Sequence, residues 1–379
     1  MSPKLLLNQL GKLTRSNDWR LSFVPFIMGS VYLWLSLFQI QVTNYTILIL
    51  ILSICTSFGF AALGYFINEY FDQKDDRVAG KFNKLSFLNR PKTLALLLLI
   101  SLTAFLPWIV LPKDSLTYYL IGAEILCFLI YSLPYIKIKK AAFLAGILDA
   151  GYAYLIPGLL SFHTFALLGK SDSNKEPFLF FAFLFFVGYR NIFLHQIKDV
   201  LKDQKTNHCS LPCLLGVKRS YLFLQILFII ELSLLIAFSV SLVITFKSQA
   251  FWLFSVLLYF LYNQKELKAV LGKESYFALL PERHVLDKLY QLWFALIQLI
   301  LLLFVDWQWI LLAPIHLLLF VDPIYLNQFW SIFWHRNVRR FLSLCINMLI
   351  YLLFKILGVD LKQIDMSALQ FMKSKFNSK

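Results

Sequence analysis

The chain has 379 residues, of which 59% are hydrophobic and only 15% are charged, with a formal net charge of +15. This composition excludes a soluble globular protein and predicts an all-α integral membrane protein embedded in a lipid bilayer. The basic residues gather in alternate loops rather than on one stripe, so nucleic acid is not a predicted partner.

An amphipathic segment, residues 1–20, precedes the first apolar run. Leu6, Leu10 and Leu13 share one helical face, which is typical of an interfacial helix lying on the membrane. Apolar segments then follow along the whole chain, and they predict about nine to eleven spans at ~20 residues each. These segments are 22–38, 45–67, 93–111, 116–136, 141–168, 178–197, 220–246, 250–262, 289–305, 307–321 and 341–357.

The loops between these segments alternate in charge. Most of the 36 lysines and arginines fall in the loops 1–20, 67–92, 137–140, 198–219, 264–288 and 322–340. The intervening loops hold only Lys113, Lys170, Lys175 and Lys247. By the positive-inside rule the N-terminus and the basic loops face the cytoplasm. We interpret the chain as a multi-pass protein of a bacterial cytoplasmic membrane.

Acidic residues cluster at the ends of two apolar segments. Residues 68–76 read NEYFDQKDD, and Asn68, Asp72 and Asp76 share one face if the helix continues through them. Asp199 and Asp203 repeat the same spacing after another segment. Oxygen ligands of this kind suit Mg²⁺, which completes its shell with water and phosphate. The five residues therefore predict a Mg²⁺ site that binds a diphosphate.

Basic side chains stand beside both clusters. Arg77 and Lys81 follow the first acids, Lys137 ends the fourth span, and Lys198 precedes Asp199. We interpret these four as diphosphate-binding, because a metal alone does not neutralise a departing diphosphate. The alternative is that they only set the membrane orientation.

Polar residues continue into the sixth span. Asn191 and His195 extend the fourfold spacing of Asp199 towards the membrane interior, and such residues usually face a cavity. His195 could also be a histidine satisfied by its neighbours.

Two charges lie deeper. Asp149 and Arg190 fall at about the same depth of ~12 Å, and we expect them to form an ion pair. The alternative is that Arg190 binds a substrate carboxylate. The acids of the loop 264–288, including Asp287, are interpreted as solvated charges.

These motifs resemble those of a known family. Asn68-Glu69-x-x-Asp72-x-x-x-Asp76 resembles the NDxxDxxxD signature of the UbiA superfamily of intramembrane prenyltransferases, with Glu69 in place of aspartate. Asp199-x-x-x-Asp203 resembles its second motif, and residues 207–216 and 131–137 resemble loops that flank the two motifs. The resemblance covers about residues 10–305.

The resemblance implies a bundle of about nine transmembrane helices around a central cavity, formed by a prenyltransferase domain at 21–305. The interfacial helix 1–20 precedes it, and an extension, 306–379, adds one or two apolar segments. The implied reaction is Mg²⁺-dependent transfer of a prenyl group from a prenyl diphosphate to an aromatic or other lipid-pathway acceptor. Asn191 and His195 would then line the acceptor end of the cavity.

Two other functions were weighed. Asp72-x-x-Asp75-Asp76-x-x-Ala79 partly resembles the CDP-alcohol phosphotransferase motif, but lacks its glycine and arginine. A transporter would use charges inside the membrane, and the candidates for that role are Glu124, Asp149, Arg190 and Glu231. The densest acids lie at the predicted membrane surface instead, which favours the prenyltransferase.

Overall fold

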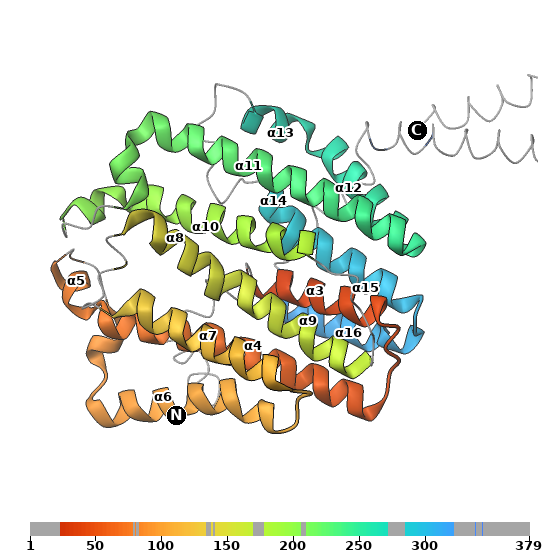
Figure 1. Cartoon of the computed structure of the whole chain (residues 1–379), viewed down its shortest axis with the longest axis horizontal. Coiled ribbons are helices and arrows are strands. Elements are labelled where there is room, and N and C mark those ends of the chain that lie inside the picture. Colours follow the sequence, from red (N-terminus) through yellow and green to blue (C-terminus); the bar gives the residue numbers. More distant parts are fainter. Residues whose placement is uncertain are drawn as a thin grey trace, which may run out of the picture. The chain divides into compact units, whose positions relative to one another are not determined.

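A computed structural model describes residues 23–321, except 79, 81–82, 134–137, 139–140, 170–177, 206–209 and 272–284, together with 338 and 343. Every regular element in this part is helical, with no strand (Figure 1). The all-α prediction is therefore confirmed, whereas the number of nine helices stays a prediction. The α-helices of this part are α3 (Phe23–Leu37), α4 (Asn44–Phe71), α5 (Gln73–Val78), α6 (Arg90–Phe105), α7 (Ser115–Ser132), α8 (Ala142–Ala150), α9 (Ile156–Gly169), α10 (Phe178–Lys205), α11 (Leu211–Thr245), α12 (Ala250–Tyr262), α13 (Gln264–Leu271), α14 (Val285–Lys288), α15 (Ala295–Leu303) and α16 (Leu312–Phe320).

Short helical turns join several of these helices. Two are π-helical, η4 (Gly151–Leu155) and η7 (Leu289–Phe294), and they continue α8 into α9 and α14 into α15. The others are η1 (Lys84–Phe87), η2 (Leu106–Ile109), η5 (Lys247–Gln249) and η8 (Trp307–Leu311). The chain divides into two units, Met1–Leu326 and Asn327–Lys379, and all these helices belong to the first. The predicted interfacial helix and nearly all of the segment 341–357 lie outside the described residues.

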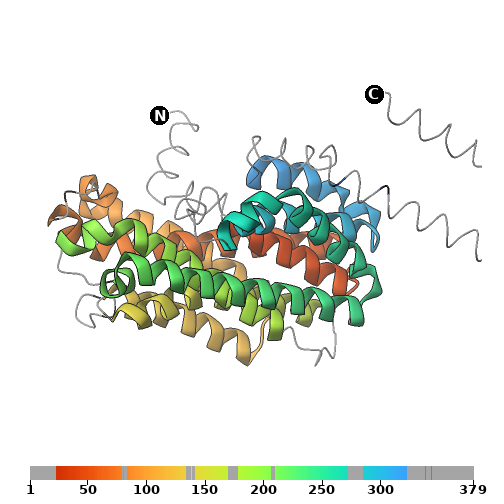
Figure 2. The same cartoon turned by 90° about the horizontal axis from the view of Figure 1, so that it is seen from above.

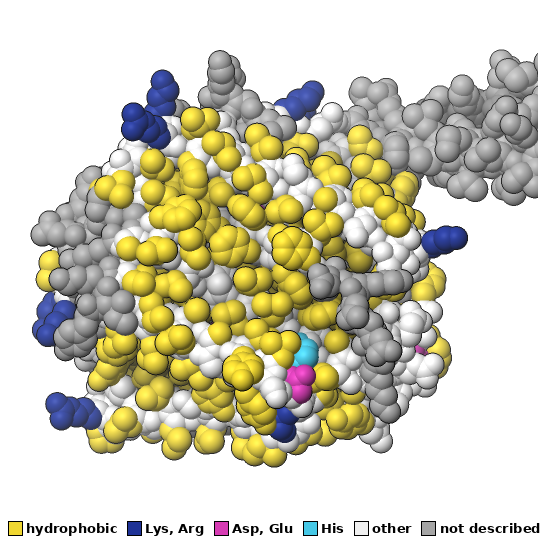
Figure 3. All heavy atoms as spheres, in the orientation of Figure 1, with side chains coloured by type: hydrophobic (Ala, Val, Ile, Leu, Met, Phe, Trp, Pro, Cys, Tyr) yellow, Lys and Arg dark blue, Asp and Glu magenta, His cyan; other side chains and the backbone are white. Residues whose placement is uncertain are grey.

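Helices long and apolar enough to cross a membrane occur seven times in the described chain. Large apolar side chains such as Leu98, Tyr119 and Ile244 are exposed on them, and Figure 3 shows hydrophobic side chains over most of one face of the molecule. A surface of this kind is stable in contact with lipid rather than water. The seven stretches are Asn44–Phe71, Arg90–Ile109, Ser115–Ser132, Phe143–Gly169, Phe178–Val200, Leu211–Thr245 and Val285–Leu303.

Local signals set the ends of the helices. Thr43 begins α4 with a reciprocal cap, in which its side chain accepts from the Thr46 amide and the Thr46 hydroxyl accepts from the Thr43 amide. Asp114 caps α7 in the same way through Thr117. Asp114 also lies 2.7 Å from Nε2 of His163, and this hydrogen bond lowers the pKa of Asp114 below its usual value.

Close packing joins α4 to α6. A Cβ added at Gly59 would lie 2.3 Å from the backbone nitrogen of Ala104, so no larger residue fits between the two helices. The Thr56 hydroxyl donates to the Ala104 carbonyl at 2.6 Å and accepts from Nε1 of Trp108 at 2.9 Å. The contact fixes the position of the part of α4 that lines the cavity described below.

The first described helix packs against the last part of the unit. Figures 1 and 2 show α3 beside α15. α3 also contacts η7, where the ring of Phe26 stacks on that of Tyr290 with centroids 5.1 Å apart. Tyr32 bonds His316 of α16 at 3.0 Å, and Nε1 of Trp309 donates to the Ile40 carbonyl. Long-range contacts therefore hold residues 306–320 against α3 and the loop that follows it. The role predicted for 306–379 stays a prediction.

Candidate active site

The first acidic motif lies where α4 passes into α5. α4 ends at Phe71, but hydrogen bonds from the Asp72 amide to the Asn68 carbonyl (2.9 Å) and from the Asp76 amide to the Asp72 carbonyl (2.8 Å) carry the helical register across the junction. Asn68, Asp72 and Asp76 are thus joined turn by turn, as the fourfold spacing predicts. Asp76 is buried, with 7% of its surface exposed.

A residue that the sequence analysis missed holds this motif. Nδ2 of Asn83 donates to Oδ2 of Asp76 at 2.9 Å and to the Glu69 carbonyl at 2.8 Å, while its Oδ1 accepts from the Leu85 amide. Asn83 therefore fastens the loop after α5 to the acids and orients one carboxylate. An asparagine in a polar loop gives no sequence signal for this role.

The second motif lies on α10, whose helix extends beyond its apolar part to Lys205. Oδ2 of Asp199 is 3.9 Å from Nε2 of His195 one turn earlier. Nδ2 of Asn191 donates to the Tyr154 hydroxyl at 2.8 Å. The side chain of Asp203 lies outside the described part, as do Lys81 and Lys137, whereas Arg77 is exposed on α5.

A cavity of about 740 Å³ lies between α4, α7, α8 to α9, and α10. Four of the predicted site residues line it, namely Asn68 on α4 and Asn191, His195 and Lys198 on α10. Asp72, Asp76, Arg77 and Asp199 are not among its lining residues. The cavity thus brings Asn68 of the first motif together with residues that precede the second motif on α10, more than a hundred positions away in the sequence.

Three carboxyl groups outside the motifs also line the cavity: Glu124, Asp149 and Asp287. Asp149 accepts from the Tyr152 hydroxyl at 2.6 Å. Tyr152 belongs to the π-helical turn η4, which precedes Pro157. Proline has no amide hydrogen to complete the α-helical pattern there, and such turns often re-aim side chains at functional sites.

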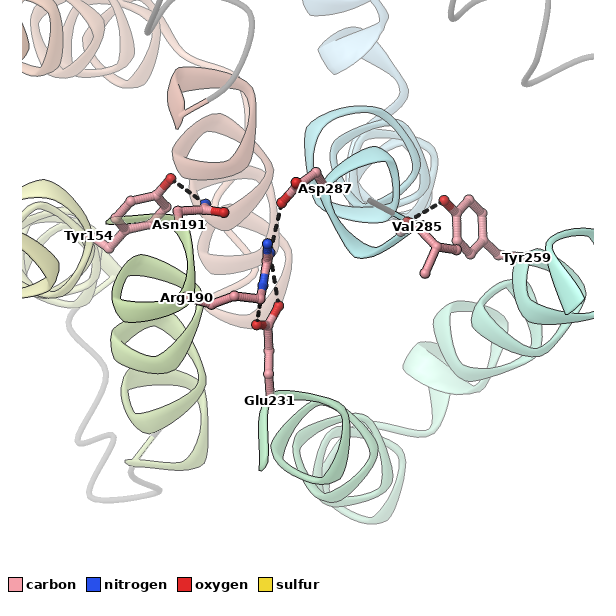
Figure 4. A network of polar contacts seen from close by, with 7 residues as sticks. All are labelled: Tyr154, Arg190, Asn191, Glu231, Tyr259, Val285 and Asp287. Atoms are coloured by element: carbon pink, nitrogen blue, oxygen red, sulfur yellow. Dashed lines mark hydrogen bonds and ion pairs between the residues drawn. The ribbon is translucent and has the colours of Figure 1, made fainter. Parts of the chain in front are cut away.

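The contacts of Arg190 show that two expectations from the sequence are wrong. Figure 4 shows Arg190 held between Glu231 of α11 and Asp287 of α14. Its Nε lies 2.5 Å and its Nη2 3.2 Å from the Glu231 carboxylate, and Nη2 lies 2.7 Å from Oδ1 of Asp287. The predicted Asp149–Arg190 pair is wrong, because Arg190 forms its ion pairs in the described chain with two other acids, Glu231 and Asp287.

Asp287 was interpreted as a solvated loop charge, and this is also wrong. Only 7% of its surface is exposed, because α14 and η7 continue into the buried helix α15. Arg190 and Glu231 are fully buried. A buried carboxylate of this kind is stable only beside a cation, and its loop-like sequence context gave no sign of that.

The comparisons with known proteins agree with this helical fold. The family model described as the UbiA prenyltransferase family matches residues 22–275. A solved structure of a UbiA homolog from Archaeoglobus fulgidus bound to DMAPP and Mg²⁺ is similar at 14% identity and a TM-score of 0.53, covering 78% of this chain and 99% of that chain. The structure of a UbiA homolog from the same organism bound to GPP and Mg²⁺ is similar at 15% identity, a TM-score of 0.50 and the same coverage. No curated protein matches.

Proposed function

The chain belongs to the UbiA prenyltransferase family, and on that premise we propose that it transfers a prenyl group from a prenyl diphosphate to a hydrophobic or aromatic acceptor, releasing diphosphate. The observation that carries the proposal is the cavity, which joins Asn68 of the first acidic motif to His195 and Lys198 beside the second. The predicted orientation places this end at the cytoplasmic face of the membrane.

The acidic end fits Mg²⁺ by the chemistry of its donors. Asn68, Asp72, Asp76, Asp199 and Asp203 would hold it through amide and carboxylate oxygens, the ligands that this ion prefers. Among the described residues, no three His, Cys, Asp or Glu side chains form a ready-made metal cluster. This suits an ion that usually binds through one or two carboxylates and takes its other ligands from water and substrate phosphates. Bound there, Mg²⁺ would supply positive charge to the departing diphosphate.

Side chains of the protein would bind the diphosphate, the prenyl chain and the acceptor. Lys198 at the cavity end would bind the diphosphate, with Arg77, Lys81 and Lys137 as further proposed contacts. The apolar walls, which include Phe60, Phe128 and Leu160, would bind the prenyl chain and exclude water from a reactive allylic cation. Aromatic faces among these walls could stabilise that cation. Asn191 and His195 would contact the acceptor.

The transporter alternative loses two of its candidate residues. Arg190 and Glu231 bond each other and are fully buried, so they act as a structural pair. Neither is among the described residues that line the cavity. This arrangement supports an enzyme whose chemistry lies at the acidic end.

The proposal is tested in membranes containing the full chain, supplied with geranyl diphosphate and a panel of aromatic and lipid-alcohol acceptors. Mass spectrometry should detect a prenylated product with Mg²⁺ and none after chelation with EDTA. Asp72→Asn and Asp199→Asn should each lower product formation roughly 100-fold or more, the scale of losing charge stabilisation in a transition state. Asp114→Asn, which alters an acid outside the cavity lining, is the matched control. Near-normal product from both motif variants would refute the site.

A further inference from the structure

The cavity has a second polar region, away from the acidic motifs. Glu124 lines the cavity at mid-length of α7, with 1% of its surface exposed. Its Oε2 has no hydrogen-bond partner among the residues that the structure describes, and neither has the hydroxyl of Ser161, which also lines the cavity. A buried polar atom without a partner is unfavourable unless a ligand or water completes it.

The depth of this region follows from helix contacts. Trp108, before the start of α7, bonds Thr56, and a Cβ added at Gly64 would lie 2.8 Å from the ring of Phe128, near the end of α7. α7 therefore runs parallel to α4, with Glu124 between the levels of Thr56 and Gly64. It lies about two turns, or ~11 Å, from the level of Asn68.

The hydroxyls of the cavity wall offer mainly acceptors, although the unpartnered hydroxyl of Ser161 can also donate. The hydroxyls of Ser53, Ser57 and Thr164 each donate their one hydrogen to a backbone carbonyl of their own helix. Thr56 donates to Ala104. All four residues line the cavity, so lone pairs remain as their free hydrogen-bonding capacity. A carboxyl group in either protonation state also accepts a hydrogen bond.

The charged residues that line the cavity further restrict the class of ligand that can bind there. Lys198 is the one lysine or arginine among the described lining residues, and it lies at the acidic end. Asp149 and Asp287 add two more carboxyl groups to the lining. A ligand carboxylate at the depth of Glu124 would be a buried charge with no lysine or arginine of the described lining beside it, because Lys198 lies at the acidic end. A plain hydrocarbon tail would leave the polar atoms without partners.

We propose that Glu124 forms an acceptor subsite that binds a neutral molecule through its hydroxyl group and disfavours carboxylated acceptors. The proposal rests on the proposed prenyl transfer for the word acceptor, but it concerns binding alone. Glu124 contacts the substrate here and determines which acceptor class enters the cavity.

The test uses the purified full chain in detergent with three probes: 1-naphthol, 1-methoxynaphthalene and 1-hydroxy-2-naphthoate. Apparent Kd values come from the ligand-dependent rise in Tm. The methoxy compound has no hydroxyl hydrogen and serves as the control for partitioning into micelles. Wild type should bind 1-naphthol about tenfold more tightly than either other probe, the effect expected of one hydrogen bond to a charged or buried acceptor.

Two variants separate the contributions. Glu124→Leu should remove the preference for 1-naphthol over its methoxy ether. Glu124→Gln keeps the shape and an acceptor oxygen, so it should retain that preference. Its amide adds N–H donors that can bind a carboxylate, so it should narrow the gap to the carboxylated probe several-fold. If Glu124→Leu does not fold, the Glu124→Gln result decides the question alone. Glu266→Gln, an exposed position on α13, is the matched control and should change none of the three values.

Equal binding of 1-naphthol and its ether by wild type would overturn the proposal, as would a carboxylate gap that Glu124→Gln leaves unchanged. A separate measurement concerns the proposed function. Geranyl S-thiolodiphosphate, a donor analogue, should raise the Tm only when Mg²⁺ is present. Failure of that measurement would count against prenyl transfer, while the naphthol series would still decide the subsite.

Discussion

Two groups of buried ionisable side chains inside the same helix bundle differ in their hydrogen-bond partners. Arg190 has two carboxylates as partners, Glu231 and Asp287, on two other helical segments. Glu124 is as deeply buried, yet its Oε2 has no partner in the described chain. In the first group the arginine bonds both carboxylates and links three helical segments, although its Nη1 has no partner in the described chain. The second offers its bonding capacity to the cavity, so partners rather than burial distinguish structural charges from ligand-binding ones.

The largest loss of stability is expected for Arg190→Met. It leaves two carboxylates buried without a cation, and we expect a loss of about 3–5 kcal/mol in the free energy of unfolding. The measurement is Tm in detergent, with Arg219→Met on an exposed part of α11 as the control. A drop no larger than that of the control would mean that the cluster does not stabilise the bundle.

A double-mutant cycle tests which acid is coupled to Arg190. Arg190→Met and Glu231→Gln remove two ends of one contact, so their effects on stability should not add. Arg190→Met and Asp149→Asn should add, because the two side chains have different partners. Coupling of Arg190 to Asp149 rather than to Glu231 would contradict the arrangement in Figure 4.

A smaller loss is expected for Asp287→Asn. Arg190 keeps its bonds to Glu231, so the substitution removes one charged partner and not the whole cluster. We expect about 1–3 kcal/mol, measured by chemical or thermal denaturation in the same detergent. Asp306→Asn, at an acid that caps η8, serves for comparison. Asp287→Asn should never destabilise more than Arg190→Met.

Tyr154→Phe should have a smaller effect. It removes the hydroxyl that accepts from Asn191 at 2.8 Å, a neutral hydrogen bond worth about 0.5–1.5 kcal/mol. Because Asn191 lines the cavity, the released amide should also change the affinity for aromatic probes. An unchanged Tm together with unchanged probe binding would show that this bond positions nothing.

Glu124→Gln should have the smallest effect on stability, and in contrast to Arg190→Met it should not destabilise. No partner in the described chain loses a bond, so the free energy of unfolding should stay within about 0.5 kcal/mol of wild type or rise. Thermal denaturation without any ligand is the measurement. A loss comparable to that of Arg190→Met would place Glu124 among the structural charges.

Much about this protein is determined by the sequence alone. The approximate positions of the apolar helices, the membrane class and the every-fourth-residue spacing of Asn68, Asp72 and Asp76 depend on residues close together in the chain, so periodicity and hydropathy suffice to predict them. The helix ends are less well predicted, since α10 continues to Lys205 and α11 begins at Leu211. The motif letters likewise led to the family that the comparisons confirm.

Which charged residues form ion pairs depends on the tertiary structure. Asp149 and Glu231 stand at the same distance in sequence from Arg190, 41 positions before and after it, so no pattern could choose between them. The choice depends on how each helix is rotated about its axis and on which neighbours it packs against. The same holds for Asn83, Asp287 and Glu124, because a side chain's burial and partners are set by helices far away in the sequence.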